Sequence, residues 1–310
     1  MAEVIQLDLF DSSFQNGNRS KKNWKRKVKP EDEPLEKKVE RALWLLRTVS
    51  AYTDQPIEVS YSGGKDSDVI LELARMANIG YRAIYRNTTI DPPGTIKHAT
   101  EMGVEMARPK MTFRQIIEKR GIPGRLRRFC CEVLKEYKIS DYAVVGVRRD
   151  ESTARAERYH EPEQCRVYNN KEKARLYYPL LDFTAQDIAD FIEWRGIKCH
   201  PLYYDEHGNF HVERRLGCMG CPLVTPKQRI KEFKEHPGMV KLYVHAAQKF
   251  FDNHPQSKMR AYIDNAAEWF VMSIYCKSVA DFKQRFKADN LFGDRIDCKA
   301  FLEKEFGIDL

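Results

Sequence analysis

The chain has 310 residues, a length that suits one large α/β domain or two modest ones. Hydrophobic residues make up 42% of it and charged residues 32%, and no stretch approaches the roughly 18 consecutive apolar residues that cross a membrane, so we expect no integral membrane protein. The 53 Lys and Arg residues outnumber the 45 Asp and Glu residues and give a net charge of +8, which allows a polyanionic partner such as a nucleotide or a nucleic acid.

The start of the chain, MAEVIQLDLFDSS, has acidic residues where a secretory signal peptide needs basic ones, and it lacks a long apolar segment. We therefore expect a cytoplasmic protein. In that reducing compartment the eight cysteines are expected to be metal ligands, catalytic groups or core residues rather than a disulfide framework.

The first 34 residues are predicted to form a disordered arm, because residues 11–34 are polar, include a basic run and show no apolar periodicity. Helical apolar spacing begins at Leu35. A short strand is predicted over residues 57–61, followed by a Ser-Gly-Gly turn and a helix over residues 66–77. Strand, glycine turn and helix in this order are typical of a parallel α/β unit.

The same alternation continues and predicts a doubly wound, mostly parallel sheet. The further strands are expected at residues 81–85, 104–107, 142–147 and 175–180, and the further helices at residues 95–102, 113–119 and 185–194. From residue 227 onward the pattern is helical. We therefore divide the chain into the arm (1–34), an α/β domain (35–225) and a C-terminal helical region (226–310).

The turn after the first strand has the composition of a phosphate-binding loop. Two glycines let the backbone approach a ligand closely, and the following helix offers free N–H groups and the positive end of its dipole. Hydroxyl groups and an ammonium group add donors suited to pyrophosphate. The residues expected to bind the nucleotide are Ser62, Gly63, Gly64, Lys65, Asp66 and Ser67. This hexapeptide, SGGKDS, resembles the signature of the PP-loop ATP pyrophosphatases, which split ATP between its α and β phosphates or bind related adenylyl nucleotides.

Four cysteines form two pairs that are predicted to hold a metal. Cys130 and Cys131 are adjacent, and Cys218 and Cys221 form a C-x-x-C motif. Four thiolates from two loops are the usual ligands of zinc or of an iron–sulfur cluster, and residues alone leave both open. The arrangement resembles that of the adenylyl-sulfate reductases, a PP-loop family, and this resemblance implies a [4Fe-4S] cluster. Lys135, one helical turn after Cys131, is expected to lie beside it.

An arginine-rich segment follows the strand predicted at residues 142–147. Arg148 and Arg149, with Arg155 and Arg158 after them, are expected at the carboxyl edge of the sheet, where they would bind an anion unless they only form a solvated basic face. The segment resembles the arginine loop of the sulfonucleotide reductases. Together with the motifs above, it identifies residues 55–225 as similar to the phosphoadenosine phosphosulfate (PAPS) and adenylyl-sulfate reductase family.

One feature of those reductases is missing from the sequence. They attack sulfur with a cysteine in a Glu-Cys-Gly-Leu-His motif, which the printed sequence does not contain, and Cys298 lacks its flanking residues. Other PP-loop enzymes adenylate an oxygen and replace it with sulfur in tRNA bases or at the DNA backbone. Cys165 lies in a segment predicted to be a mobile loop, where it is a candidate sulfur carrier.

A short motif in the arm points to DNA. It resembles the pentapeptide by which bacterial proteins dock on the replicative sliding clamp, although an incidental amphipathic N-terminus has the same pattern. The residues concerned are Gln6, Leu7, Asp8, Leu9 and Phe10.

The leading hypothesis is a PP-loop enzyme that uses ATP or an adenylyl nucleotide, with Mg²⁺, to activate or thiolate a nucleic acid, DNA being favoured over tRNA. Its catalytic residues would be Lys65, Asp66, Arg148 and Arg149. One alternative is an adenylyl-sulfate or PAPS reductase that produces sulfite. Another is a non-catalytic nucleotide-binding module that is recruited to the clamp.

Overall fold

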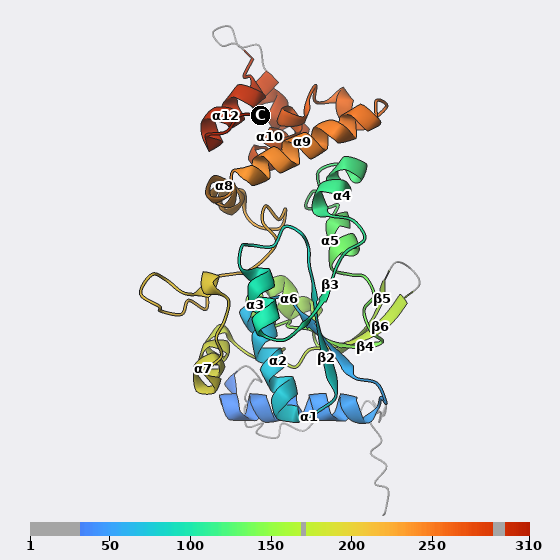
Figure 1. The fold of residues 1–310 in the computed structure, drawn as a ribbon, viewed down its shortest axis with the longest axis vertical. Coiled ribbons are helices and arrows are strands. Elements are labelled where there is room, and N and C mark those ends of the chain that lie inside the picture. Colours follow the sequence, from blue (N-terminus) through green and yellow to red (C-terminus); the bar gives the residue numbers. More distant parts are fainter. Residues whose placement is uncertain (1–31, 169–171, 288–294) are drawn as a thin grey trace, which may run out of the picture.

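The computed structural model describes residues 32–168, 172–287 and 295–310 (Figure 1). The clamp-like motif at residues 6–10 and nearly all of the arm lie outside the described residues. No helix in the described ranges combines the length and the apolar character needed to cross a membrane.

A six-stranded sheet forms the centre of the α/β part, in the order β3-β2-β1-β4-β6-β5. All neighbouring strands run parallel except β5, which pairs antiparallel with β6 at one edge. The mostly parallel sheet with flanking helices is therefore confirmed. The strands are β1 (Ile57–Tyr61), β2 (Tyr81–Arg86), β3 (Glu105–Ala107), β4 (Tyr142–Val144), β5 (Glu163–Tyr168) and β6 (Glu172–Tyr177).

Three helices pack together beside this sheet: α1 (Leu35–Ala51), α2 (Lys65–Ala77) and α7 (Ala185–Arg195). Their apolar faces and the buried side of β1 make one continuous core, in which Leu46, Val59 and Ile188 are almost fully buried. Burial of such side chains stabilises the fold by about 1.5–3 kcal/mol each. Because β1 ends and α2 begins inside this core, the turn between them is held rigidly.

A second core joins the C-terminal helices to α4 (Phe113–Arg120). We call this group, α4 and α8 to α12, the helical lobe. Figure 1 shows it at the end of the molecule opposite α1, with α4 alongside α9. Large aromatic side chains such as Phe233, Tyr243 and Phe270 fill its interior. The other members are α8 (Pro226–Glu235), α9 (Gly238–Asn253), α10 (Ala266–Tyr275), α11 (Val279–Phe282) and α12 (Cys298–Phe306).

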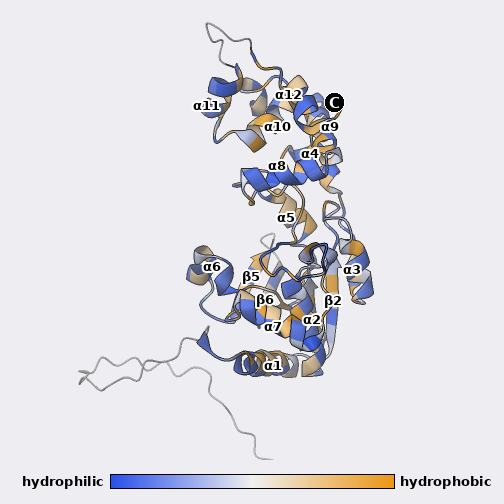
Figure 2. Cartoon of the chain, turned by 90° about the vertical axis from the view of Figure 1, so that its left-hand side faces the viewer, coloured by the Kyte–Doolittle hydropathy of each residue, from blue (hydrophilic) through white to orange (hydrophobic). Residues whose placement is uncertain are grey.

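Several short helices lie within the α/β part or between it and the helical lobe. Helix α5 (Phe129–Leu134) lies between the two in both Figure 1 and Figure 2. Helix α3 (Thr95–Glu101) precedes β3, and α6 (Thr153–Arg158) follows β4. Single helical turns of the 3₁₀ or π type occupy Arg149–Glu151, Pro201–Tyr203, Lys258–Ala261 and Lys283–Lys287.

Three expectations from the sequence are corrected. The segment predicted as a mobile loop around Cys165 is the edge strand β5, because its antiparallel register with β6 satisfies its backbone hydrogen bonds. The last two strands are displaced or shortened: β6 begins at Glu172 rather than residue 175, and β4 ends at Val144 rather than residue 147. The short helices α5 and α6 were not anticipated.

Candidate functional site

The glycine turn, which we define as residues 62–67, connects β1 to α2 at the carboxyl end of the sheet. Gly63 has a φ of +79°, and a Cβ atom there would lie 2.8 Å from the Cγ2 atom of Thr95. Only glycine therefore fits this position without strain. Helix α2 begins at Lys65 with no side-chain cap on its first turn. The N–H of Lys65 donates to the hydroxyl of Tyr203 and that of Ser67 to the carbonyl oxygen of Gly64, so the start of α2 offers an anionic ligand mainly the positive end of the helix dipole.

The two serines of the glycine turn have different roles. The hydroxyl of Ser67 is buried and donates a hydrogen bond to the carbonyl oxygen of Gly64 at 2.7 Å, which stiffens the turn. The hydroxyl of Ser62 is exposed and donates to Ser67 at 3.2 Å. Of the two, Ser62 is the one that solvent, and hence a ligand, reaches.

Lys65 carries its charge into a largely buried position. Its ammonium group lies 3.4 Å from the carboxylate of Asp66 and 3.4 Å from the carbonyl oxygen of Arg214. Burial is the main effect that lowers the pKa of Lys65, and the neighbouring Arg148 and Arg215 cations lower it further. An anionic ligand beside this ammonium would raise the pKa again, since it would add to the negative charge of Asp66.

Arginine side chains converge on the same place. Arg148 is buried, and its Nε donates to the Asp66 carboxylate at 2.6 Å. Burial lowers the pKa of Arg155, and the charges of Arg215 and Arg148 lower it further. Carboxylates of the same region, including Asp66, neutralise only part of this charge. The cluster suits the bidentate capture of a phosphate group.

Arg149 and Arg158 do not join this cluster. The Arg149 guanidinium donates to the carbonyl oxygens of Tyr159 at 2.8 Å and His160 at 2.5 Å, and it pairs with Asp182. Arg158 lies over the ring of Tyr159. Arg149 therefore ties the segment after α6 to the loop that follows β6, away from the glycine turn.

Sequence reasoning assigned no role in the site to two residues that border the glycine turn. Arg215 joins the cation cluster from the loop that leads to Cys218, and only the Arg-Arg pair beside the C-x-x-C motif hinted at it. Tyr203 is buried, and its hydroxyl accepts hydrogen bonds from the N–H groups of Lys65 and Leu216, both at 3.3 Å. It couples the start of α2 to the same loop.

A buried polar network connects α2 to β1 and α3. The carboxylate of Asp68 is fully buried, accepts a hydrogen bond from the hydroxyl of Tyr61 and lies 3.0 Å from Nε2 of His98. Burial is the main effect on Asp68 and raises its pKa. Because Tyr61 ends β1 and His98 lies in α3, the network fixes the first turns of α2 between two elements.

We define the thiol site as Cys130, Cys131, Cys218 and Cys221. The first pair lies at the start of α5 and the second in the loop before α8. A hydrogen bond with Cys131 and burial raise the pKa of Cys130, and the charges of Cys218 and Cys221 raise it further. Cys130 and Cys218, far apart in the sequence, thus pack against the same core, close enough for the charges of the two pairs to interact.

The helical lobe holds the second pair through Gly220. Its carbonyl oxygen accepts hydrogen bonds from Nε of Arg229 at 3.2 Å and the hydroxyl of Tyr243 at 3.3 Å, and its N–H donates to Glu232 at 2.9 Å. Gly220 has a φ of +67°, and a Cβ atom would lie 2.6 Å from the ring of Phe233. The C-x-x-C loop is thus locked against α8 and α9.

The surroundings of the thiol site fit a negatively charged group. Nη2 of Arg229 is buried with no hydrogen-bond partner among the described residues, and Arg229 interacts electrostatically with Cys221. Lys135 lies beside Cys218, as the sequence predicts. Two cations next to four thiols favour thiolate ligands of a metal. Within the described ranges, however, no three His, Cys, Asp or Glu side chains already stand around a common point as metal ligands would.

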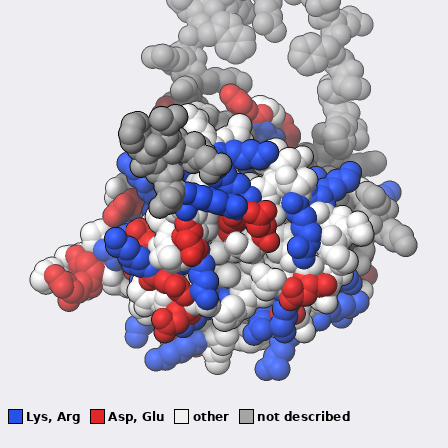
Figure 3. All heavy atoms as spheres, turned by 90° about the horizontal axis from the view of Figure 1, so that it is seen from above, with Lys and Arg blue, Asp and Glu red and all other residues white. Residues whose placement is uncertain are grey.

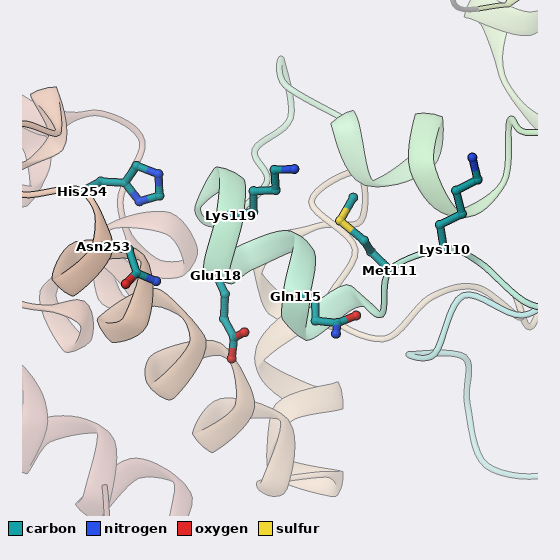
Figure 4. Close-up of a pocket in the computed structure, with 7 residues that line it drawn as sticks. All are labelled: Lys110, Met111, Gln115, Glu118, Lys119, Asn253 and His254. Carbon is teal, nitrogen blue, oxygen red and sulfur yellow. The ribbon is translucent and has the colours of Figure 1, made fainter.

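A separate cavity of about 360 Å³ lies between α4 and the end of α9. Figure 4 shows its lining, in which Glu118 and Lys119 come from α4 and Asn253 from α9. The Glu118 carboxylate is already paired, with Arg114 at 3.0 Å and Lys249 at 3.5 Å. The lining includes no residue of the glycine turn, the cation cluster or the thiol site, so we assign it no part in nucleotide binding.

The sequence profile of the phosphoadenosine phosphosulfate reductase domain matches residues 56–224, more than half of the chain. The chain belongs to this family. The match includes the glycine turn, the arginine segment and all four cysteines of the thiol site. The family resemblance expected from the motifs is thereby confirmed.

Curated relatives of this family member are distant. An uncharacterized protein of Methanocaldococcus jannaschii is 28% identical over 239 residues, which cover 73% of this chain and 56% of that protein. A sulfate adenylyltransferase subunit 2 of Alkalilimnicola ehrlichii is 29% identical over 199 residues, which cover 53% of this chain and 62% of that protein. The chain therefore spans less than two thirds of the length of either relative.

Among solved structures, the phosphoadenylyl-sulfate reductase of Candida auris is 14% identical and covers 60% of this chain and 95% of its own, with a TM-score of 0.41. This likeness is too weak to support a comparison of sites.

Proposed function

We propose that the chain is a nucleotide-dependent enzyme that binds ATP or an adenylyl nucleotide at the glycine turn and uses it to activate or thiolate a nucleic acid. The observation that carries this proposal is the convergence of Lys65, Arg148, Arg155 and Arg215 on the start of α2, where Lys65 and Arg148 both contact Asp66. Carboxylates such as Asp66 balance only part of this positive charge, and the phosphates of a nucleotide would neutralise the rest.

The side chains of the glycine turn suggest how the phosphates are handled. Lys65 and Arg148 would neutralise the charge that develops on a departing pyrophosphate, because both already face Asp66 at the start of α2. Asp66 would help to recruit Mg²⁺. Arg149 was expected to bind the anion. It is proposed instead as a positioning residue, since its guanidinium donates hydrogen bonds to the carbonyl oxygens of Tyr159 and His160.

The thiol site is proposed to hold a [4Fe-4S] cluster through Cys130, Cys131, Cys218 and Cys221. The support is the proximity of the four thiols and the two bordering cations, Lys135 and Arg229. When bound, such a cluster supplies a redox-active iron centre. The buried Arg229 would orient the loop of Cys221 and offset the negative charge of the thiolates.

A sulfite-releasing reductase is the second candidate, favoured by the family itself. It needs a nucleophilic thiol outside the thiol site. Cys298 lies at the start of α12 and is buried, which raises its pKa to about 12. Burial likewise raises the pKa of Cys276 to about 11. Such thiols make poor nucleophiles, as does the buried Cys199, so a reductase would depend on the exposed Cys165.

The identity of the target rests on less. The overall positive charge suits either nucleic acid, and the clamp-like motif at residues 6–10 favours DNA over tRNA. Figure 3 shows basic and acidic side chains interspersed over the end formed by the helical lobe, so this face has no single-sign field for a polyanion. We also propose that the protein acts in the cytoplasm and docks on a sliding clamp through residues 6–10.

The test is to measure the products formed from ATP and from adenylyl sulfate by anaerobically prepared protein. We expect pyrophosphate from ATP, stimulated by DNA or tRNA and abolished in Lys65→Ala but not in Lys97→Ala, an exposed lysine of α3. Sulfite from adenylyl sulfate with thioredoxin would instead establish the reductase. Tight nucleotide binding without either product would establish a non-catalytic module.

A further inference from the structure

A small exposed loop connects α4 to α5, and its residues take no part in the site described above. We call residues 124–128 the tip loop. Its turn is closed by the N–H of Arg127, which donates to the carbonyl oxygen of Gly124 at 3.1 Å. Leu126 at its apex is 99% exposed, whereas the next most exposed large apolar side chain among the described residues, Tyr52, reaches 68%. An aliphatic side chain held wholly in water gains nothing from the fold itself.

The charge of the tip loop is equally unbalanced. Arg125, Arg127 and Arg128 surround Leu126, and all three are exposed. None of them has an ion pair with any residue in the described part of the chain, although most other arginines there do. Three uncompensated guanidinium groups around one apolar side chain are suited to a polyanion that also offers an apolar surface.

The tip loop borders the thiol site. It runs directly into α5, whose first turn carries Cys130 and Cys131. Arg128 lies close enough to Cys131 for the two charges to interact. A molecule bound at the tip loop is therefore brought next to the thiols.

We propose that the tip loop is a nucleic-acid wedge, in which the arginines bind backbone phosphates while Leu126 inserts between bases of an unpaired or loosened segment. This inference rests on the proposed nucleic-acid target and names the surface that engages it. Apolar wedges flanked by basic side chains are a known way to unstack bases, and an enzyme that modifies a base or its backbone benefits from such access. A protein partner fits less well, because one leucine is far smaller than the roughly 800 Å² that each side of a stable protein interface buries.

The test uses the full chain and a single-stranded 20-mer DNA containing 2-aminopurine, a base whose fluorescence rises when it unstacks. We expect Arg125→Gln/Arg127→Gln to weaken binding at low salt by about tenfold and to lower the slope of log affinity against log salt by about 1.4, since each contact on a single strand contributes roughly 0.7. Leu126→Ala should leave that slope unchanged but remove most of the fluorescence rise. Arg128 is left intact because it borders the thiol site.

Two controls separate the outcomes. Lys97→Gln/Lys231→Gln removes two exposed cations from α3 and α8, changes the net charge equally and should bind like the wild type. Pyrophosphate release from ATP without nucleic acid should be the same in all variants.

If the wild type binds DNA and the tip-loop variants match the control, the wedge is refuted and the nucleic-acid target stands. If the wild type binds neither DNA nor tRNA, both fail while nucleotide use stands. If the variants change self-association in light scattering but not DNA binding, the surface serves a protein and the wedge is again refuted.

Discussion

Replacing Gly220 by alanine should destabilise the protein by about 2–5 kcal/mol and displace the loop of Cys218 and Cys221. The left-handed φ of +67° costs an alanine about 1–2 kcal/mol. The new Cβ would lie 2.6 Å from Cζ of Phe233 and 3.0 Å from the hydroxyl oxygen of Tyr243. Both side chains are buried in the helical lobe and have little room to move, so overpacking adds about 1–3 kcal/mol.

Gly208 provides a matched control for this variant. It has a similar φ of +83°, but no atom lies within 4 Å of the position of an added Cβ. Gly208→Ala should therefore cost only the backbone strain, about 1–2 kcal/mol. The assay is urea unfolding, together with the iron content of anaerobically prepared protein, which should fall in Gly220→Ala alone. Equal losses of stability in the two variants would refute the steric argument.

Three further predictions concern the glycine turn and the thiols. Lys65→Ala removes the buried ammonium group and should raise the dissociation constant of ATP at least tenfold, which corresponds to about 1.4 kcal/mol of binding free energy. Calorimetry would measure this change, and the control Lys97→Ala should leave the dissociation constant unchanged. Cys218→Ser should lower the iron content well below the four atoms of a cubane cluster, and an unchanged iron content would remove that residue from the ligand set. With a pKa of about 12, Cys298 is only ~10⁻⁴ ionised at pH 8, so iodoacetamide should label it far more slowly than the exposed Cys165, as mass spectrometry would reveal. Equal labelling rates would show that Cys298 is accessible.

Local signals in the sequence were sufficient for the central part of the fold. The strand at Ile57–Tyr61, the glycine turn and the helix that follows are set by short-range patterns of burial and by Gly63, and the structure has them within a residue of the predicted bounds. By contrast, β5 exposes the apolar Val167 beside Glu163 and Cys165, and its position depends on its antiparallel pairing with β6, which no local pattern encodes.

The candidate site was predictable in its motifs but not in its final membership. Arg148 and Arg149 are neighbours in sequence, yet Arg148 faces Asp66 while Arg149 faces Tyr159 and Asp182. Which of two adjacent side chains points toward the glycine turn depends on backbone direction at the end of β4. The contribution of Arg215 likewise depends on how a distant loop returns to the sheet.

The bracing of Gly220 has a consequence for the order in which the protein matures during synthesis. The glycine turn is complete early, but the carbonyl oxygen of Gly220 is held by Arg229 and Tyr243, and Arg229 in turn donates to the carbonyl oxygen of Ser273 in α10 at 3.0 Å. Because a ribosome releases the N-terminal part first, the nascent chain can fold its sheet while the second thiol pair is still unsupported. Any metal delivery would thus follow the synthesis and folding of α8 to α10.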